Sequence, residues 1–498
     1  MTSQHLITML QNFKYLCFCI IIAVLSNNIC AQNNVIGLND LISYAYKLSA
    51  NIELYKIQQK MNYENYQIAM HSTMPTLKFS ISPQYSHAIS PITQPDGSMQ
   101  NKDVNNFSLV PTLTFSTPIP FTGGTLSISS NFNFYQYKNA NITNKNYSMN
   151  MYYINISQPL NFFNTQGWSR KTNKTNFSMN NYKSIQDYID IKLDISEQYF
   201  EIIKYRELIN TYIKLQQNFS KILKTYQELY KEGKILKQNL DEIKIRELDF
   251  DEKIKFNRIS LKYATINLNN YLCNQIKIDE IQLTTPSNLV VYIDSTMAQN
   301  ILSQKQNLYM NISKIPFERS LAEAKSKQGV DATLNLGIGK NTQSTDISNL
   351  FENQSPSINI SINLNVPITD IKTRRKQYKI AKLQLYENSK KMEINQSEER
   401  NNLNLNIEKL SYLRDHYYHL VVKDKNLEDK MKLQETLLNA NKILFEEYNN
   451  SLNDYLMNKI ELQSALKDIY ITYYQIESLT MYNFISGRNY LHLLNNYN

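Results

Sequence analysis

Only a few residues of this sequence have the types and spacing that chemistry would need. His416 and His419 stand three apart and could share one face of a helix, as two ligands of a metal ion would. A zinc site needs at least a third protein ligand, and the neighbouring sequence offers none. No phosphate-binding loop, nucleophile elbow or zinc-binding His-Glu pattern occurs. The sequence therefore predicts no catalytic residue, no cofactor and no metal centre, and thus no enzyme.

Composition also points away from a nucleic-acid-binding protein. The 498 residues carry a net charge of +9, with basic and acidic side chains mixed along the chain. A nucleic-acid partner would call for a basic stripe or a known reading motif, and the sequence has neither. The chain is 42% hydrophobic and 19% charged, which excludes a disordered tail. The charge is therefore interpreted as the solvated surface of helices.

The N-terminus predicts export. Lys14 precedes an apolar run over residues 15–25, which is too short for a stable membrane anchor. Cleavage after a small residue would make 1–31 a signal peptide, whereas the alternative is a lipid anchor on Cys30, whose two preceding residues are poorly suited. Either way we expect the chain to leave the cytoplasm. Cys273 would then be the only cysteine left, so no internal disulfide could form.

Long stretches without Gly or Pro predict very long helices. The 65 residues between Gly167 and Gly233 contain neither, and nor do the 119 residues between Pro367 and Gly487. Apolar positions there recur at alternating steps of four and three, the spacing of helices that wind around each other. The two seams are Ile195, Tyr199, Ile202, Arg206, Ile209 and Ile213, and then Leu462, Leu466, Ile469, Tyr473 and Ile476. A second apolar stripe beside the first seam allows a ring of helices around a hollow, and a solid bundle is the alternative.

Six segments alternate as β-strands do. They are Thr76–Ile89, Phe107–Ile119, Thr125–Tyr137, Tyr147–Leu160, Ala332–Gly339 and Ser357–Val366. In Ser357–Val366, apolar residues alternate strictly with Ser and Asn. About ten residues of alternation is what a tilted strand needs to cross a bilayer. One chain offers too few strands to close a barrel alone, so several copies would have to share one.

The order of these elements indicates an internal duplication. We divide the chain into a first repeat (32–286, strands 76–160, long helices 168–232 and 234–275) and a second repeat (287–498, strands 332–366, long helices 369–448 and 451–486). In this alignment, the turn at Gly233-Lys234-Ile235 matches Asn450-Ser451-Leu452. The first repeat carries an additional hairpin, roughly Phe107–Tyr137.

Together these features resemble the TolC / outer membrane efflux protein family over essentially the whole mature chain. Besides the duplication, the motifs that carry the resemblance are Ala50-Asn51-Ile52 running to Met74-Pro75-Thr76-Leu77, the strand endings Ile156–Leu160 and Leu364–Ile368, and the turns Tyr230–Ile235 and Tyr448–Leu452.

The resemblance implies both an architecture and a function. The architecture is mostly α with a β-barrel portion: a homotrimer with an α-barrel and a twelve-stranded transmembrane β-barrel. Its place is the outer membrane of a Gram-negative cell, in contact with lipid and extending into the periplasm. The function is passive conduction within a tripartite efflux or type I secretion system, together with a periplasmic adaptor and an inner-membrane pump.

By the same resemblance, the two helical turns are the expected docking and gating sites for the adaptor. These residues are Gly233, Lys234, Ile235 and Leu236 in the first turn and Asn450, Ser451, Leu452 and Asn453 in the second. Asp241, Glu242 and Asp454 follow the turns and are candidates for a constriction, although such acids are more often ordinary solvated helix residues. A secreted coiled-coil surface protein and a periplasmic adaptor are the alternatives for the whole chain. The alternating strands and the duplicated order argue against the first, and the repeated helical hairpin without Gly-rich flanks argues against the second.

Overall fold

A computed structural model describes most of the chain. The described residues are 35–93, 96–139, 143–161, 163–273, 278, 281–286, 292–352, 354–366, 368–440 and 442–490. The signal peptide predicted over 1–31 and the alternative lipid site at Cys30 lie outside them. Among the described helices, none combines the length and the apolar character needed to cross a bilayer.

The chain divides into two compact units, each built from separate stretches of sequence. The first, the hairpin unit, comprises Met1–Ile57, Ser184–Leu302 and Asn401–Tyr490. The second, the sheet unit, comprises Gln58–Lys183, Ser303–Arg400 and Leu491–Asn498. The longest helices contribute residues to both units.

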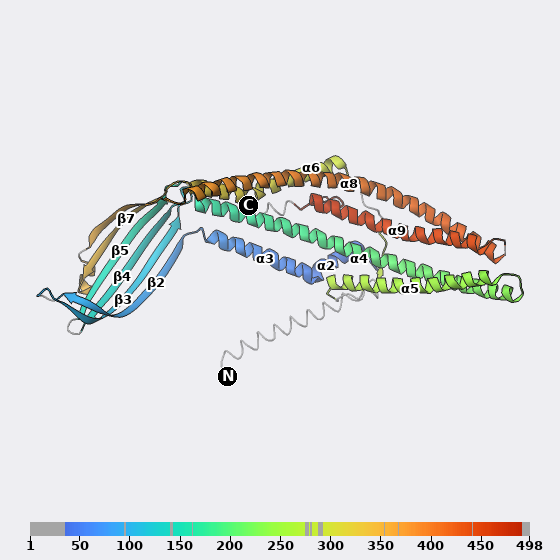
Figure 1. Cartoon of the computed structure of the whole chain (residues 1–498), viewed down its shortest axis with the longest axis horizontal. Coiled ribbons are helices and arrows are strands. Elements are labelled where there is room, and N and C mark those ends of the chain that lie inside the picture. Colours follow the sequence, from blue (N-terminus) through green and yellow to red (C-terminus); the bar gives the residue numbers. More distant parts are fainter. Residues whose placement is uncertain are drawn as a thin grey trace, which may run out of the picture. The chain divides into compact units, whose positions relative to one another are not determined.

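Helices make up most of the described chain (Figure 1). Their bounds are α2 Leu38–Leu48, α3 Ala50–His71, α4 Thr165–Lys231, α5 Lys237–Tyr271, α6 Ser295–Ser313, α7 Ile315–Ser326, α8 Ile371–Asn439 and α9 Phe445–Thr480. Helices α4 and α8 contain 67 and 69 residues, or about 100 Å each at 1.5 Å per residue. A short 3₁₀ turn, Ile347–Leu350, is also present.

One antiparallel sheet holds all the long strands of the described chain (Figure 1). They are β2 Thr76–Thr93, β3 Met99–Pro118, β4 Thr125–Asn139, β5 Thr143–Pro159, β7 Asp331–Ser344 and β8 Ser355–Asn365, in the order β2-β3-β4-β5-β7-β8. Two small sheets lie apart from it: β1 Val35–Ile36 pairs with β6 Gln282–Leu283, and β9 Tyr482–Asn483 pairs with β10 Arg488–Asn489. All six strands expected from alternation are therefore neighbours in a single sheet.

A tyrosine lies over two glycines at the β5–β7 pair. Tyr153 is directly opposite Gly339, and its ring extends diagonally over Gly337. A Cβ added at Gly337 would collide with the Tyr153 hydroxyl, and one added at Gly339 would stand 2.5 Å from the backbone oxygen of Tyr152. The two glycines therefore leave room for the aromatic ring, as glycines in curved sheets do when a cross-strand aromatic covers them.

The second helical turn is not where the sequence analysis placed it. Helix α8 ends at Asn439 and α9 begins at Phe445, so 450–453 lies inside a helix. The predicted boundary between helices 369–448 and 451–486 is therefore wrong, because the turn precedes it in the sequence. The first turn lies between α4 and α5, as expected around Gly233.

The two turns share a short motif and the same geometry. Lys234-Ile235-Leu236 recurs as Lys442-Ile443-Leu444. The Lys234 N–H donates to the Leu229 carbonyl at 2.9 Å, and the Lys442 N–H donates to the Leu437 carbonyl at 2.9 Å. Both leucines have the extended backbone of an N-cap residue, with φ −77° in each case. In the sequence, Asn441 precedes the second motif where Gly233 precedes the first.

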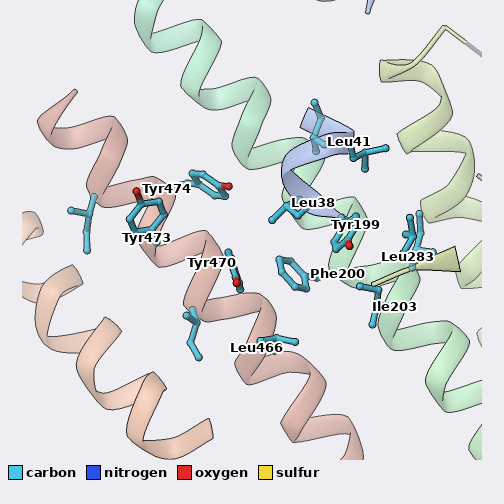
Figure 2. Close-up of a cluster of buried hydrophobic side chains, with 14 of the residues drawn as sticks. Leu38, Leu41, Tyr199, Phe200, Ile203, Leu283, Leu466, Tyr470, Tyr473 and Tyr474 are labelled. Atoms are coloured by element: carbon cyan, nitrogen blue, oxygen red, sulfur yellow. The ribbon is translucent and has the colours of Figure 1, made fainter. Parts of the chain in front are cut away.

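The predicted seams form the core of the hairpin unit. Ile195, Tyr199 and Ile202 of α4 are almost fully buried, as are Leu466, Ile469, Tyr473 and Ile476 of α9. Figure 2 shows this cluster, in which side chains from α2, α4, β6 and α9 pack together. Arg206 occupies a seam position for a different reason: its guanidinium donates to the carbonyls of Ile281 and Ile278 at 2.6 and 2.7 Å.

A buried ion pair joins α4 to the C-terminal end of the hairpin unit. The Lys192 ammonium contacts the Glu477 carboxylate, and the two side chains are 8% and 0% exposed. The Tyr490 hydroxyl donates to the same carboxylate at 2.9 Å, and the Asn483 amide donates at 3.1 Å. Burial, followed by the Glu477 charge, raises the pKa of Tyr490, so the phenol stays a donor at physiological pH. This network fixes the segment after α9.

We predict that the two glycines differ in their tolerance of a methyl group. Gly337→Ala meets only the end of the Tyr153 side chain, which can rotate away. Gly339→Ala meets backbone, so the β5–β7 pair must shift at a cost of about 1–3 kcal/mol. The temperature at which the folded band disappears from gels of heated samples should fall for Gly339→Ala and stay near the parent value for Gly337→Ala. The reverse order would contradict the assignment.

We also predict that the buried ion pair behaves as a unit. Glu477→Gln leaves the Lys192 ammonium buried without a charge partner, which should cost about 3–5 kcal/mol of unfolding free energy. The double variant Lys192→Met, Glu477→Gln removes both charges, keeps an acceptor for Tyr490 and Asn483, and should recover most of the loss. Thermal unfolding in detergent, monitored by circular dichroism, measures the stability of the single and the double variant. Equal losses for the single and double variants would show that the pair does not act in this way.

Candidate functional site

The histidine pair does not assemble a metal site. His416 Nε2 lies 3.5 Å from a carboxylate oxygen of Glu461, and its ring stacks on Tyr412 with centroids 5.5 Å apart. Nowhere in the described part of the chain do three His, Cys, Asp or Glu side chains come together as metal ligands. The features that stand out instead are the sheet and the two helical turns.

One face of the sheet is apolar across every strand. The strand register places one apolar residue from each strand side by side in a single row: Leu77, Phe115, Ile128, Ile154, Ile338 and Ile358. The two ends of this row, on β2 and β8, are each 70% exposed. Large apolar side chains rarely form so extended an exposed surface on a water-soluble protein, so this apolar face requires an apolar environment.

The opposite face of the same sheet is polar. The next row consists of Thr76, Ser116, Ser127, Asn155, Gly337 and Asn359. The row on the other side consists of Lys78, Thr114, Ser129, Tyr153, Gly339 and Ser357, which adds only one charge. Small hydroxyl and amide groups thus cover this polar face, which is suited to water. A sheet with one apolar and one polar face is what a strand period of two produces at a boundary between lipid and water.

Aromatic side chains lie on the apolar face farther from the β3–β4 turn than the row that contains Phe115 and Ile128. The rings of Phe107 and Phe134 lie 6.0 Å apart, and those of Phe134 and Tyr147 lie 5.2 Å apart. Tyr85 lies opposite Phe107, and from there on this face of β2 and β3 carries polar groups. The Tyr85 hydroxyl donates to Asn105 at 2.8 Å, and His87 lies beside the same amide at 2.9 Å. Aromatic residues are enriched where membrane-crossing strands meet the interface.

The first helical turn projects an exposed leucine. Gly233 has φ +70°, and a Cβ added there would meet no atom within 4 Å, so this residue ends α4 in a left-handed conformation with open space around it. Ile235 packs against the cluster at this end of the hairpin unit, whereas Leu236 is 73% exposed. Lys234 is also exposed and pairs with Glu232 at 2.8 Å. The four residues predicted for this turn are therefore together at one tip.

The second tip is formed by Lys442, Ile443 and Leu444, not by the predicted residues. Ile443 packs inward and Leu444 is 64% exposed, which repeats the first tip. Ser451 and Leu452 are 2% and 0% exposed within α9, so neither can meet a partner. The other two predicted residues also lie on α9, where Asn450 is exposed and Asn453 accepts a hydrogen bond from Arg246.

The three candidate acids lie on the helices that follow the tips: Asp241 and Glu242 near the start of α5, and Asp454 farther along α9. Asp241 lies 3.4 Å from Lys244, and the Glu242 carboxylate accepts from Gln238 at 3.3 Å. Asp454 lies 4.0 Å from Lys430 with its side chain 59% exposed. All three are thus accessible to solvent in one chain, as a lining residue or an ordinary surface residue would be.

A cluster of aromatic side chains holds the two hairpins together behind the tips. Phe219 of α4 packs against Phe250 of α5 and against Phe445 and Tyr448 of α9, with centroids 4.9, 6.0 and 5.8 Å apart. Arg246 of α5 lies over the Phe250 ring at 5.1 Å while it donates to α9. Neither this cluster nor the second tip was predicted from the sequence, although the repeated Lys-Ile-Leu indicates the tip.

Comparison with known proteins supports the same architecture. No family model matches the chain, and no curated protein matches its sequence. Solved structures do match. The CmeC outer membrane channel of Campylobacter jejuni is 13% identical with a TM-score of 0.62, covering 89% of this chain and 85% of that one. The outer membrane protein VceC of Vibrio cholerae is 12% identical with a TM-score of 0.62, covering 89% and 96%.

A further match, CusC, whose structures concern transmembrane channel formation, is 13% identical with a TM-score of 0.60, covering 89% of this chain and 91% of that one. At identities this low, the structural matches establish the fold alone, and they do so over most of both chains. The resemblance in the sequence motifs is thereby confirmed at the level of architecture: this chain has the fold of the TolC-type outer-membrane efflux channels.

Proposed function

We propose that the protein is an outer-membrane channel subunit that conducts substrates passively to the cell exterior. The observation that carries this proposal is the two-faced sheet, whose apolar face fits lipid and whose polar face fits a water-filled lumen. A helix would need a long apolar stretch to cross the same bilayer. Strands need only alternate, as these do.

The proposed assembly is a homotrimer, as the resemblance implies. Helix α5 supports an assembly because apolar residues at near-heptad spacing stay exposed along it: Ile245, Leu248, Phe256, Ile259, Tyr263 and Ile266. Such a seam on one chain is suited to a helix from another copy. The sheet supports it too, since one chain leaves two strand edges open.

The proposed partners at the tips are a periplasmic adaptor and, through it, an inner-membrane pump of an efflux or type I secretion system. Leucine is a poor N-cap residue because it cannot accept a hydrogen bond from the first-turn amides. Both Leu236 and Leu444 occupy N-cap positions without any side-chain bond. Since folding gains little from them, a docking role for these exposed side chains explains why both tips have one.

Energy for transport comes from the pump in this proposal, so the chain needs no active site. Its contribution is a path, to which the polar sheet face and helices of about 100 Å each supply a wall. Asp241, Glu242 and Asp454 are proposed to line the narrow end. There, carboxylates from several copies would together favour cations over anions.

The membrane assignment is tested by fractionation. Expressed at native level, the mature chain should sediment with outer-membrane vesicles, resist extraction by carbonate, and enter solution only with detergent. The apolar face provides the reason, because lipid replaces water there. A soluble chain in the periplasm or medium would contradict the proposal and would favour a secreted coiled-coil protein.

The docking assignment is tested at the two exposed leucines. Leu236→Asp combined with Leu444→Asp should abolish export while the oligomer still assembles, because both side chains are already in water. Resistance of a complemented deletion strain to a panel of toxic compounds, with secreted proteins measured alongside, gives the readout. The matched control is Leu236→Met with Leu444→Met, which keeps the apolar surface and should keep export. Full export by the aspartate variant would contradict a docking role for Leu236 and Leu444.

A further inference from the structure

The described sheet has two open edges, one on β2 and one on β8. Six strands lie in a continuous antiparallel order, so the two edge strands run in opposite directions. If β8 of one copy met β2 of a second copy, they would therefore pair antiparallel, as every other pair in the sheet does.

The ladder shows which backbone groups face each open edge. In an antiparallel sheet, the N–H and C=O of one residue point to the same neighbour, and those of the next residue point the other way. The Ile119 N–H donates to the Gly124 carbonyl at 2.8 Å, so odd-numbered residues of β3 bond to β4 and even-numbered ones bond to β2. On β2 the odd-numbered residues are then left facing outward.

The backbone groups at the other open edge, on β8, alternate in the same way. The Leu160 N–H donates to the Ala332 carbonyl at 2.8 Å, so even-numbered residues of β7 bond to β5. Its odd-numbered residues bond to β8, which leaves the even-numbered residues of β8 facing outward. The backbone groups without a strand partner in one chain are thus those of Leu77, Phe79 and Ile81 on β2, and of Ile358, Ile360, Ile362 and Leu364 on β8.

Proline positions agree with this assignment. Pro83 and Pro91 on β2 are odd-numbered, and Pro356 on β8 is even-numbered, so the nitrogen of each faces the open edge. No ladder bond is lost within the chain, since proline has no N–H to donate. Between the prolines and the strand ends, Thr76–Ser82 and Ser357–Asn365 keep all their donors. These two stretches are where a further strand can pair.

The outward-facing backbone groups belong to residues of the apolar face. Joining odd-numbered residues of β2 to even-numbered residues of β8 therefore continues the apolar row on one side and the polar row on the other. Left open in lipid, each of these groups would be unsatisfied, because a bilayer core offers no hydrogen-bonding partner. The edges match in direction, in free donors and in side-chain pattern.

We propose that β8 of each copy pairs with β2 of the next, so that all six strands of every copy enter one cylinder. This rests on the proposed membrane channel and refines it. Three copies of six strands give eighteen strands, in place of the twelve that the family resemblance implies. Because barrel diameter grows about linearly with strand number, the exit would be roughly half again as wide as in a twelve-stranded barrel.

Engineered disulfides test the edge pairing in outer-membrane vesicles. In a Cys273→Ser background, Ser80→Cys on β2 is combined in turn with Asn359→Cys, Ser361→Cys or Asn363→Cys on β8. All four positions lie on the polar face, where an aqueous oxidant has access. We expect at least one combination to shift the monomer band to dimer and trimer bands on non-reducing gels, and native mass measurement of the cross-linked particle to give three copies.

The matched control replaces Ser80→Cys with Ser129→Cys on β4, with the same three β8 partners. Ser129 also lies on the polar face but would meet β8 of another copy only if the β2–β3 hairpin stood outside a twelve-stranded barrel. Cross-links through Ser129, or a two-copy particle, would overturn the eighteen-strand proposal and leave the channel intact. A chain that stays monomeric in the vesicles with no cross-link at all would overturn both.

Discussion

Unpaired backbone hydrogen-bonding groups at the two sheet edges are the constraint on which the rest of this structure depends. They belong to residues whose side chains form the exposed apolar face. Water could satisfy the backbone groups but not the side chains, and lipid could satisfy the side chains but not the backbone. Only a neighbouring strand within lipid satisfies both. The sheet of a single chain therefore leaves groups unsatisfied that an assembly of several copies can satisfy.

The helices meet the same requirement in a different way. Their backbone is satisfied within each helix, so what remains unmet is apolar side-chain surface. Part of it is buried within one chain, where α4 and α9 pack around Tyr199 and Tyr473. The apolar seam along α5 and the leucines at the tips remain exposed in one chain. We propose that the α5 seam packs against another copy of the chain and that the exposed leucines contact a different partner.

Much of this architecture could be predicted from the sequence because its signals are local. Alternation in Ser357–Val366 identified β8, and the long stretches without Gly or Pro identified the helices. The second turn was misplaced because Gly233-Lys234-Ile235 was matched to Asn450-Ser451-Leu452, whereas the repeated Lys-Ile-Leu begins at Lys442. The Lys192–Glu477 pair could not have been found, since the two residues are far apart in sequence and neither seam indicates which charged side chain is buried. Which backbone groups face the open edges depends on the register of all six strands, and alternation alone does not provide that register.

The central claim is that copies of this chain satisfy their open edges by pooling strands into a common cylinder. A density map of the detergent-purified assembly, resolved well enough to trace strands, measures this directly. The account predicts a closed cylinder in which the strand carrying Ile360 of one copy lies hydrogen-bonded beside the strand carrying Phe79 of the next. An open sheet, or a cylinder whose wall excludes the β2–β3 hairpin of each copy, would contradict it.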